Sequence, residues 1–257
     1  MTTTLYAAPL SWSRDVLFTN STDEDWISFA PTTSFLTSSL TPPAGMWTMD
    51  NFYRGRNLGS EGQRLNCSDT GLVWSKEGPL GSGSDLKYAY FNGIKTPRIQ
   101  NRHNGSYLLD FTKPFTITMW VKTNRHGVCP IIQTWNSDLR KYAQTSLWFH
   151  PSKFRNQIYL SANKRIFSHL NNTGRLEWRH IAATYNGIQK YSLYLNAYEW
   201  KISKTIAGIN FPSDFDIIFI GYYMKPAYRF KGAMACLSIF KRALTQQEIR
   251  EWMQTCP

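Results

Sequence analysis

The sequence predicts an all-β protein in which two antiparallel sheets pack as a sandwich, with one short helix at the C-terminal end. Short apolar segments recur along the chain and are separated by Gly, Pro, Asn and Ser, a pattern typical of strands joined by tight turns. Residues 115–122 alternate with period two, which indicates a half-buried strand. Residues 245–253 carry the clearest helical pattern. Many short strands and one helix therefore favour a β-sandwich.

The predicted strands follow one another from residue 45 to residue 240. The dipeptide Asn186-Gly187 predicts a hairpin between two of them, because it readily adopts the positive φ angles of a type I′ turn. Residues 54–84 are rich in Gly, Ser and Asn and are predicted to be loop. In chain order, the strands are residues 45–50, 88–93, 115–122, 131–135, 146–149, 157–161, 178–185, 191–195, 217–221 and 230–240.

The predicted C-terminal helix has a defined start. Thr245 and Glu248 stand three positions apart, the spacing of a capping box, in which each side chain binds the backbone N–H of the other residue. Ile249, Trp252 and Met253 follow on one face. The helix is therefore expected to be amphipathic and capped.

Residues 1–44 differ from the rest of the chain, because they are rich in Thr, Ser and Pro and contain the acidic cluster Asp23-Glu24-Asp25. The break Thr-Pro-Pro-Ala-Gly at residues 41–45 indicates a domain boundary. We expect residues 1–44 to be an N-terminal extension that packs on the sandwich or contacts a neighbour, and residues 45–257 to be the sandwich domain. Self-association through residues 1–44, as in a matrix or filament subunit, is one alternative function.

The composition is typical of a β-rich extracellular protein, since 42% of the residues are hydrophobic, 15% aromatic and only 18% charged. No apolar run approaches the roughly 20 residues of a transmembrane helix, so membrane insertion is not expected. The first residues do not resemble a signal peptide. Four glycosylation sequons and an even number of cysteines favour a secreted or cell-surface glycoprotein. The sequon asparagines are Asn20, Asn66, Asn104 and Asn171.

Four cysteines allow three disulfide pairings. Cys236–Cys256 is the favoured pair, because a bridge from the last strand to the tail would hold the helix between them. Cys67 and Cys129 are then left to pair with each other. The alternative is that all four are buried thiols.

The formal net charge is +12, yet Lys and Arg are spread along the chain without a block of five or six like charges. Scattered basic residues usually form a solvated surface. The alternative is a folded basic patch that attracts sulfated or sialylated glycans. No zinc finger, basic zipper or RNA-recognition motif accompanies the charge, so nucleic acid is not expected as a partner.

Five segments match, in order, motifs of one family. They are residues 47–50 (WTMD), 115–122 (FTITMWVK), 178–187 (WRHIAATYNG), 191–196 (YSLYLN) and 230–249, which begins FKGAMACLSIF and ends RALTQQEI. Over residues 45–257 the chain thus resembles the laminin G-like, concanavalin A-like lectin and glucanase superfamily, which includes the pentraxins. The resemblance implies a jelly-roll sandwich used mainly as an extracellular recognition or adhesion module for glycans or proteins.

Calcium, which some members of this family bind, is disfavoured here. Where relatives often carry Asp at two hairpin positions, this chain has Asn186 and Asn196, and Ala197 replaces the usual Gly. Calcium prefers several carboxylate oxygens. The five histidines show no spacing typical of a metal site. No metal or other cofactor is therefore expected.

Catalysis is not expected either. Glycosidases on this scaffold need two facing carboxylates, typically in a Glu-x-Asp-x-x-Glu strand, and the chain has no such string. Asp214 and Asp216 share one face of an extended segment, but the preceding Pro212 favours a loop or strand-entry role. No Gly-x-Ser-x-Gly motif occurs. A glycan-active enzyme on the same scaffold is the alternative from another class.

Two segments are candidates for ligand binding. Residues 221–230 place tyrosines and cations around a proline, which suits a sugar ring that carries a carboxylate or sulfate; Tyr222 and Phe230 are interpreted as core residues. An ordinary surface hairpin is the alternative interpretation of the second segment. The candidates are Tyr223, Lys225, Tyr228 and Arg229 in the first segment, and Arg140, Lys141, Tyr142 and Trp148 in the second. The predicted function is a non-catalytic extracellular recognition or adhesion module for glycans, anionic ones above all, or for proteins.

Overall fold

The computed structural model describes residues 40–47, 58–60, 65–66, 72–75, 88–93, 97–103, 106–123, 129–136, 141–151, 156–162, 165–170, 177–188, 190–199, 215–222 and 226–255. These residues belong to the unit Ser38–Pro257. Most of the predicted extension, residues 1–44, lies outside the described residues, so its role stays a prediction.

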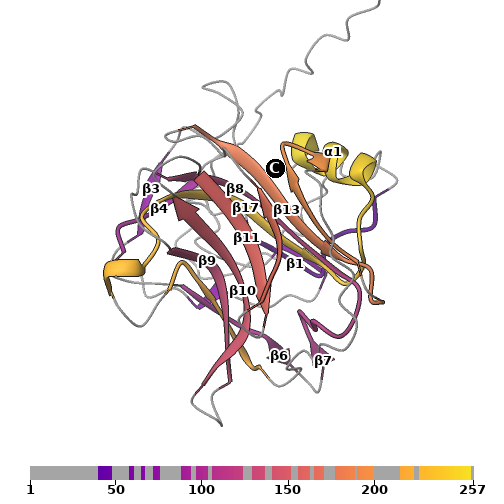
Figure 1. Ribbon diagram of the computed structural model, residues 1–257, viewed down its shortest axis with the longest axis horizontal. Coiled ribbons are helices and arrows are strands. Elements are labelled where there is room, and N and C mark those ends of the chain that lie inside the picture. Colours follow the sequence, from indigo (N-terminus) through magenta and orange to yellow (C-terminus); the bar gives the residue numbers. More distant parts are fainter. Residues whose placement is uncertain are drawn as a thin grey trace, which may run out of the picture. The chain divides into compact units, whose positions relative to one another are not determined.

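Eight of the described strands form the first sheet, in the order β15-β14-β13-β8-β17-β4-β3, with β1 also paired to β17. Neighbouring strands run antiparallel. The strands are β1 (Gly45–Trp47), β3 (Leu72–Ser75), β4 (Tyr88–Phe91), β8 (Phe115–Thr123), β13 (Arg179–Tyr185), β14 (Tyr191–Leu195), β15 (Tyr198–Glu199) and β17 (Gly232–Phe240). Figure 1 shows β8, β13 and β17 running side by side at the centre of this sheet.

Seven of the described strands form the second sheet, in the order β12-β11-β10-β9-β16-β5-β2, again antiparallel throughout. They are β2 (Leu65–Asn66), β5 (Arg98–Gln100), β9 (Cys129–Asn136), β10 (Lys141–Pro151), β11 (Asn156–Ala162), β12 (Arg165–Leu170) and β16 (Ile217–Ile220). The remaining described elements are the hairpin β6 (Arg102–His103) and β7 (Ser106–Tyr107), the 3₁₀ helix η2 (Pro226–Tyr228) and the helix α1 (Gln246–Thr255).

The hydrophobic core lies between the two sheets. Alternation along β8 turns Ile117 and Met119 inward, and β16 likewise contributes Ile218 and Ile220; all four are at most 1% exposed. Three phenylalanines fill one part of this core: the ring of Phe111 lies 5.0 Å from that of Phe115 and 5.2 Å from that of Phe215. The predicted two-sheet sandwich is therefore confirmed.

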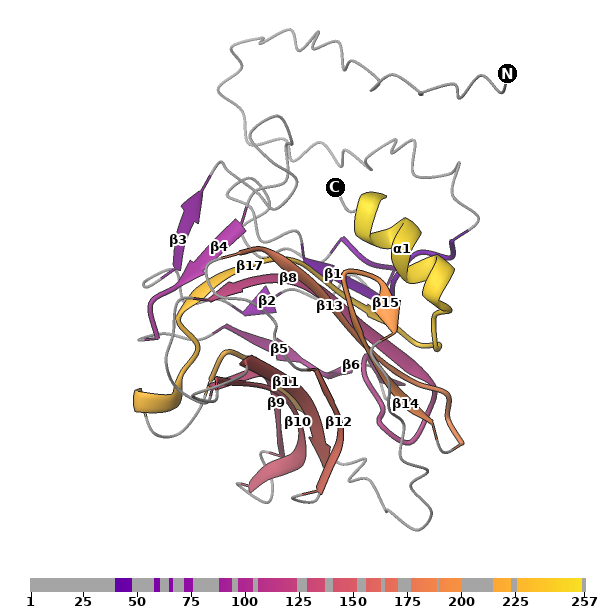
Figure 2. The same cartoon turned by 45° about the horizontal axis from the view of Figure 1, so that its top comes forward.

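Helix α1 packs on the outer face of the first sheet, away from the second sheet (Figure 2). Ile249 and Trp252 of the helix are buried against Met46, Tyr194 and Phe240 of the strands. The rings of Phe240 and Trp252 meet edge to face at 5.2 Å. The predicted apolar face of the helix thus covers part of one outer face of the sandwich. Leu40, from the end of the predicted extension, is buried in the same cluster.

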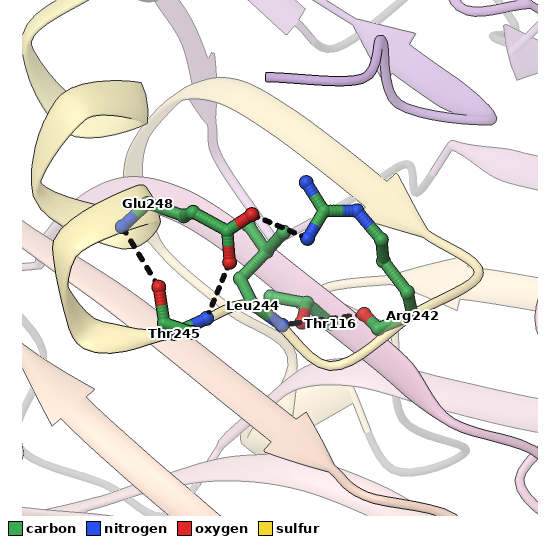
Figure 3. A network of polar contacts seen from close by, with 5 residues as sticks. All are labelled: Thr116, Arg242, Leu244, Thr245 and Glu248. Carbon is green, nitrogen blue, oxygen red and sulfur yellow. Dashed lines mark hydrogen bonds and ion pairs between the residues drawn. The ribbon is translucent and has the colours of Figure 1, made fainter. Parts of the chain in front are cut away.

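A network of polar contacts fixes the start of α1 (Figure 3). Thr245 Oγ1 accepts the backbone N–H of Glu248 at 3.2 Å, and Glu248 Oε2 accepts the backbone N–H of Thr245 at 2.7 Å. Arg242 Nη1 donates to Glu248 Oε1 at 2.6 Å. On β8, Thr116 Oγ1 accepts the N–H of Leu244 and donates to the carbonyl oxygen of Arg242, both at 2.8 Å. The predicted capping box is confirmed, and Thr116 ties it to the sheet.

The cysteines do not all follow the predicted pairing. Cys129 is a buried thiol within the core between the sheets, so the predicted Cys67–Cys129 disulfide is wrong. Cys236 is disulfide-bonded. Cys67 and Cys256 lie outside the described residues, and the pair Cys236–Cys256 therefore stays a prediction.

Candidate functional site

The outer face of the second sheet carries the candidate site. Along β16, Ile218 and Ile220 point into the core, whereas Ile217 and Phe219 are half-buried on the other face. The register pairs Phe219 with Gln133 of β9, and Ile217 with Trp135. Directly paired residues of an antiparallel sheet share a face, so Trp135 and Phe219 lie on the same outer surface.

Three aromatic rings and one guanidinium form a continuous row on this surface. The ring of Trp135 lies 6.5 Å from that of Phe219, and Phe219 lies 4.7 Å from Tyr222. The guanidinium carbon of Arg229 lies 5.0 Å from the centre of the Tyr222 ring, within the range of a cation–π contact. We call Trp135, Phe219, Tyr222 and Arg229 the aromatic row.

The backbone conformation at Gly221 positions Arg229, the charged end of the aromatic row. Gly221 adopts a positive φ of 69°, which ends the alternation of β16. Its N–H donates to the carbonyl oxygen of Ile131, and its own carbonyl oxygen accepts the N–H of Phe230, both at 2.8 Å. The chain therefore leaves the sheet at Gly221 and returns beside it, which brings Arg229 over Tyr222.

The structure separates the residues of the first candidate segment. Arg229 is half-buried and belongs to the aromatic row, whereas Tyr228 is 40% exposed on η2. Phe230 is a core residue, as interpreted from the sequence. The interpretation of Tyr222 as a core residue is wrong, because its half-buried ring packs on Phe219 instead. Tyr223 and Lys225 lie outside the described residues.

The second candidate segment falls on the same sheet. Lys141, Tyr142 and Trp148 all belong to β10, of which the structure describes the backbone but not the side chains; Arg140 lies outside the described residues. The register pairs Tyr142 with Trp135. The backbone therefore brings the two predicted segments to neighbouring parts of one sheet, although far apart in the sequence.

Gln133 lies beside the aromatic row and was not predicted. Its side chain is 4% exposed, and its Oε1 is buried without a hydrogen-bond partner. A buried amide oxygen that lacks a donor costs free energy. A buried polar group therefore lies next to the aromatic row. No local sequence pattern identifies Gln133, Trp135 or Phe219 as site residues. They come together only through the pairing of β9 with β16.

Asn186 and Asn196 both have structural hydrogen bonds. Asn186 Oδ1 accepts the N–H groups of Ile188 at 3.0 Å and Lys190 at 2.9 Å, which closes the predicted hairpin turn. Asn196 Oδ1 accepts the N–H of His180 at 3.0 Å. In the described part of the chain, no three His, Cys, Asp or Glu side chains come together as a metal site needs. The expectation about calcium stays a prediction.

Two other groups of predicted residues are placed only in part. Asp216 directly precedes β16, where its N–H donates to the carbonyl oxygen of Trp135 at 3.1 Å; Asp214 lies outside the described residues. Of the sequon asparagines, Asn66 belongs to β2, whereas Asn20, Asn104 and Asn171 lie outside the described residues. None of the described helices is long and apolar enough to cross a membrane.

Sequence comparison identifies one family. The model of the concanavalin A-like lectin/glucanases superfamily matches residues 90–250. These residues include the aromatic row and most of both sheets. No curated protein sequence matches the chain.

Solved structures with the same fold are distant in sequence. The botulinum neurotoxin serotype D binding domain superposes with a TM-score of 0.62 at 13% identity, over 83% of this chain and 50% of that one. The serotype D ligand binding domain in complex with N-acetylneuraminic acid gives 0.61 at 12% identity, over 83% and 50%.

Domain 4 of AbnA, a GH43 extracellular arabinanase from Geobacillus stearothermophilus, in complex with arabinotriose, gives a TM-score of 0.53 at 18% identity, over 82% of this chain and 97% of that one. The chain therefore spans about half of the toxin domains and nearly all of the arabinanase domain. At these identities the likeness establishes the fold.

Proposed function

As the chain belongs to the concanavalin A-like lectin/glucanases superfamily, we propose that it is a non-catalytic recognition module that binds anionic glycans on the outer face of its second sheet. The aromatic row is the observation that carries the proposal. Flat, partly exposed rings bind the apolar faces of sugars, and an arginine at the end of the row binds a carboxylate or sulfate through two parallel hydrogen bonds.

The contrast between the two outer faces supports this location. The outer face of the first sheet is partly covered by α1, which buries Tyr194 and Phe240. On the second sheet, Phe219 and Trp135 stay half-buried, and Arg98 and Gln100 of β5 are exposed. Because Arg98 is paired with Phe219 in the register, a second cation lies on the same face as the row.

The charge of the chain supports an anionic ligand. A net charge of +12 attracts anions to the protein as a whole. Arg229 provides a fixed cation, because its stacking on Tyr222 restricts the side chain before any ligand arrives. The solved domains that are bound to arabinotriose and N-acetylneuraminic acid have the same fold and support a saccharide as the ligand.

The sequons and the disulfide-bonded Cys236 support a secreted or cell-surface location and a role in adhesion.

Glycan cleavage is the second candidate function, because the superfamily includes glucanases. A turnover assay on a panel of polysaccharides separates the two functions. We expect binding without release of reducing ends.

A glycan array tests the proposal directly. We expect the purified protein to retain sulfated or sialylated glycans at low salt and to lose most of them at high salt, because ion pairs on a surface are screened within about 8–10 Å at physiological ionic strength. A chelator should change little. Retention of neutral glycans alone, unaffected by salt and abolished by the chelator, would contradict the proposal.

A further inference from the structure

One edge of the second sheet carries a glycosylation sequon. Asn66 of β2 begins the tripeptide Asn-Cys-Ser at residues 66–68. Among the described strands, β2 is the last at this end of the sheet. An N-linked glycan is a bulky, water-soluble group that is carried at a protein surface, and the edge strand of a sheet offers such a place. The register of β2 then decides on which face of the sheet the sequon lies.

The register places Asn66 on the outer face. Leu65 is paired with Ile99 of β5, and Asn66 is paired with Arg98. Ile99 is buried in the core between the sheets, whereas Arg98 is exposed. Because directly paired residues share a face, Leu65 belongs to the core face, and Asn66 belongs to the face that carries the aromatic row.

Asn66 also stands at the level of the aromatic row. Arg98 is paired with Phe219 of β16, so Asn66, Arg98 and Phe219 form one line across three neighbouring strands. Neighbouring strands lie about 4.8 Å apart, which puts the backbone of Asn66 about 10 Å from that of Phe219. A branched glycan of several sugar rings is longer than this distance. A glycan on Asn66 therefore reaches the row across Arg98.

The chemistry of the row favours such a contact. Flat rings that are partly exposed bind the apolar faces of sugars, and Phe219 and Tyr222 are both half-buried. A glycan that is covalently tied nearby has a high effective concentration at the row, because its binding is intramolecular. An acidic glycan also places its negative charge beside Arg98 and Arg229, the cations assigned above to an anionic ligand.

We propose that Asn66 is glycosylated and that its glycan covers the aromatic row for part of the time, which limits the access of other glycans. This regulation rests on the proposed function of the row. At an edge strand the glycan has a second effect, because it hinders the addition of a strand from another chain. The fraction of time for which the row is open sets the apparent affinity: a row open for about a third of the time binds about threefold more weakly.

The first measurement is the occupancy of Asn66. The protein is secreted from cultured animal cells, and its glycans are released by peptide-N-glycosidase in heavy-oxygen water, which converts each occupied Asn into a labelled Asp. Mass spectrometry of the peptide around Asn66 then gives the occupancy. We expect most molecules to carry this glycan. Unmodified Asn66 would overturn the inference without any binding experiment.

The second measurement compares the affinities of sequon variants for two probes, sialyllactose and a heparin hexasaccharide, by calorimetry at fixed salt. Ser68→Ala removes the sequon and leaves Asn66 in place, whereas Ser68→Thr keeps the sequon. We expect Ser68→Ala to bind about threefold more tightly than the wild type, and Ser68→Thr to bind as the wild type does. Asn66→Gln removes the glycan by a different substitution and should reproduce Ser68→Ala.

Asn171→Gln is the matched control for the loss of a glycan. Asn171 follows the last residue of β12, the strand at the opposite end of the same sheet. Four strand spacings separate β12 from β16, which amounts to about 19 Å. Its loss should leave the affinity unchanged.

Two further outcomes would overturn the inference: an unchanged affinity in both Ser68→Ala and Asn66→Gln while Arg229→Gln weakens binding, or an equal gain in Asn171→Gln. In both cases the proposed function stands. If no form of the protein binds either probe, although Asn66 is occupied, the proposed function fails and the regulation of the row fails with it.

Discussion

His180 of β13 is an ionisable side chain buried in the first sheet, with 1% of its surface exposed. Its Nε2 lies 3.1 Å from Thr118 Oγ1, and its ring packs against Trp120 at 5.3 Å. Burial lowers the pKa of His180 from 6.5 to about 3. Because the unfolded chain takes up the proton first, the neutral imidazole stabilises the fold fully above pH 6.5, and this contribution falls as the pH drops toward 3.

Replacing His180 with Gln should therefore reduce the acid sensitivity of the fold. Between pH 6 and 4.5, the wild type should lose about 1.4 kcal/mol more per pH unit than the variant, which corresponds to one proton. The amide of His180→Gln can still bond to Thr118, and all other groups titrate alike in both proteins. Urea unfolding at several pH values measures the difference. Parallel curves would show that His180 takes up its proton at the same pH in the folded and the unfolded protein, which contradicts the lowered pKa.

Gly232, at the start of β17, has a backbone conformation that residues other than glycine rarely adopt. Its φ is 149°, and a Cβ placed there would lie 2.2 Å from the carbonyl oxygen of Lys122. That oxygen belongs to the neighbouring strand β8 and cannot move without disturbing the sheet. We expect Gly232→Ala to destabilise the fold by about 2 kcal/mol or more, because strain and a clash combine.

Chemical unfolding of the variant measures this loss. Gly59→Ala is unsuitable as a control, because its Cβ would meet the backbone of Ala44 at 2.5 Å. Ala227→Gly, on the exposed η2, is a better one and should change stability by less than about 1 kcal/mol. A Gly232→Ala protein as stable as the wild type would mean that β17 is not held this closely against β8.

Tyr222 shows where reasoning from single residues fails. Period-two alternation carried on from Ile218 and Ile220 would turn Tyr222 into the core, and this was the interpretation from the sequence. The positive φ of Gly221 breaks the alternation and returns Tyr222 to the side of Phe219. Glycine adopts a positive φ readily, but a glycine in the sequence does not by itself predict that it will do so. For Phe230, in contrast, the interpretation from the sequence is confirmed, because this residue is buried in the core.

Among the elements, helix α1 depends on its first turn. Burial alone would raise the pKa of Glu248, but hydrogen bonds from Thr245 and Arg242 outweigh it, so its pKa lies below 4.5. The ionised carboxylate therefore stabilises the helix above pH 4.5, and this contribution is lost as the pH falls through the folded pKa. Thr245→Ala should cost about 1 kcal/mol.

Two further variants sharpen this test. Thr245→Ser keeps the hydroxyl and should behave nearly as the wild type. Glu248→Gln should be less stable than the wild type at pH 7, and the difference should shrink below pH 4.5. Thermal unfolding at pH 7 and at pH 3.5 measures both effects. A difference that does not change with pH would contradict the assigned role of the carboxylate.

Most of the strands and the helix could be predicted from the sequence, whereas the pairing of the strands within the sheets could not. The capping box is a local pattern of four residues, and the structure confirms it. The strand at residues 115–122 corresponds to β8. The pairing of β16 with β9 joins segments separated by several other strands, and no local pattern encodes it. The aromatic row depends on that pairing, and the sequence therefore predicted Arg229 as a candidate but neither Trp135 nor Phe219.

At the scale of the whole molecule, the two outer faces differ in how they are covered. On one of them, α1 covers Phe240 and Tyr194. The other carries the aromatic row, next to β10 with the second candidate segment. A chain with a net charge of +12 attracts anions as a whole, so a test of the proposed site must separate binding at the row from this general attraction.

Paired arginine variants test this distinction most directly. Arg229 stacks on Tyr222 at 5.0 Å, and Arg250 of α1 stacks on Tyr198 at 5.9 Å, so each substitution removes one charge and one similar contact. The measurement is the affinity of wild type, Arg229→Gln and Arg250→Gln for the best anionic glycan of the array, by calorimetry at fixed salt. We predict binding about tenfold weaker for Arg229→Gln and unchanged for Arg250→Gln. Equal losses in the two variants would contradict a site on the second sheet.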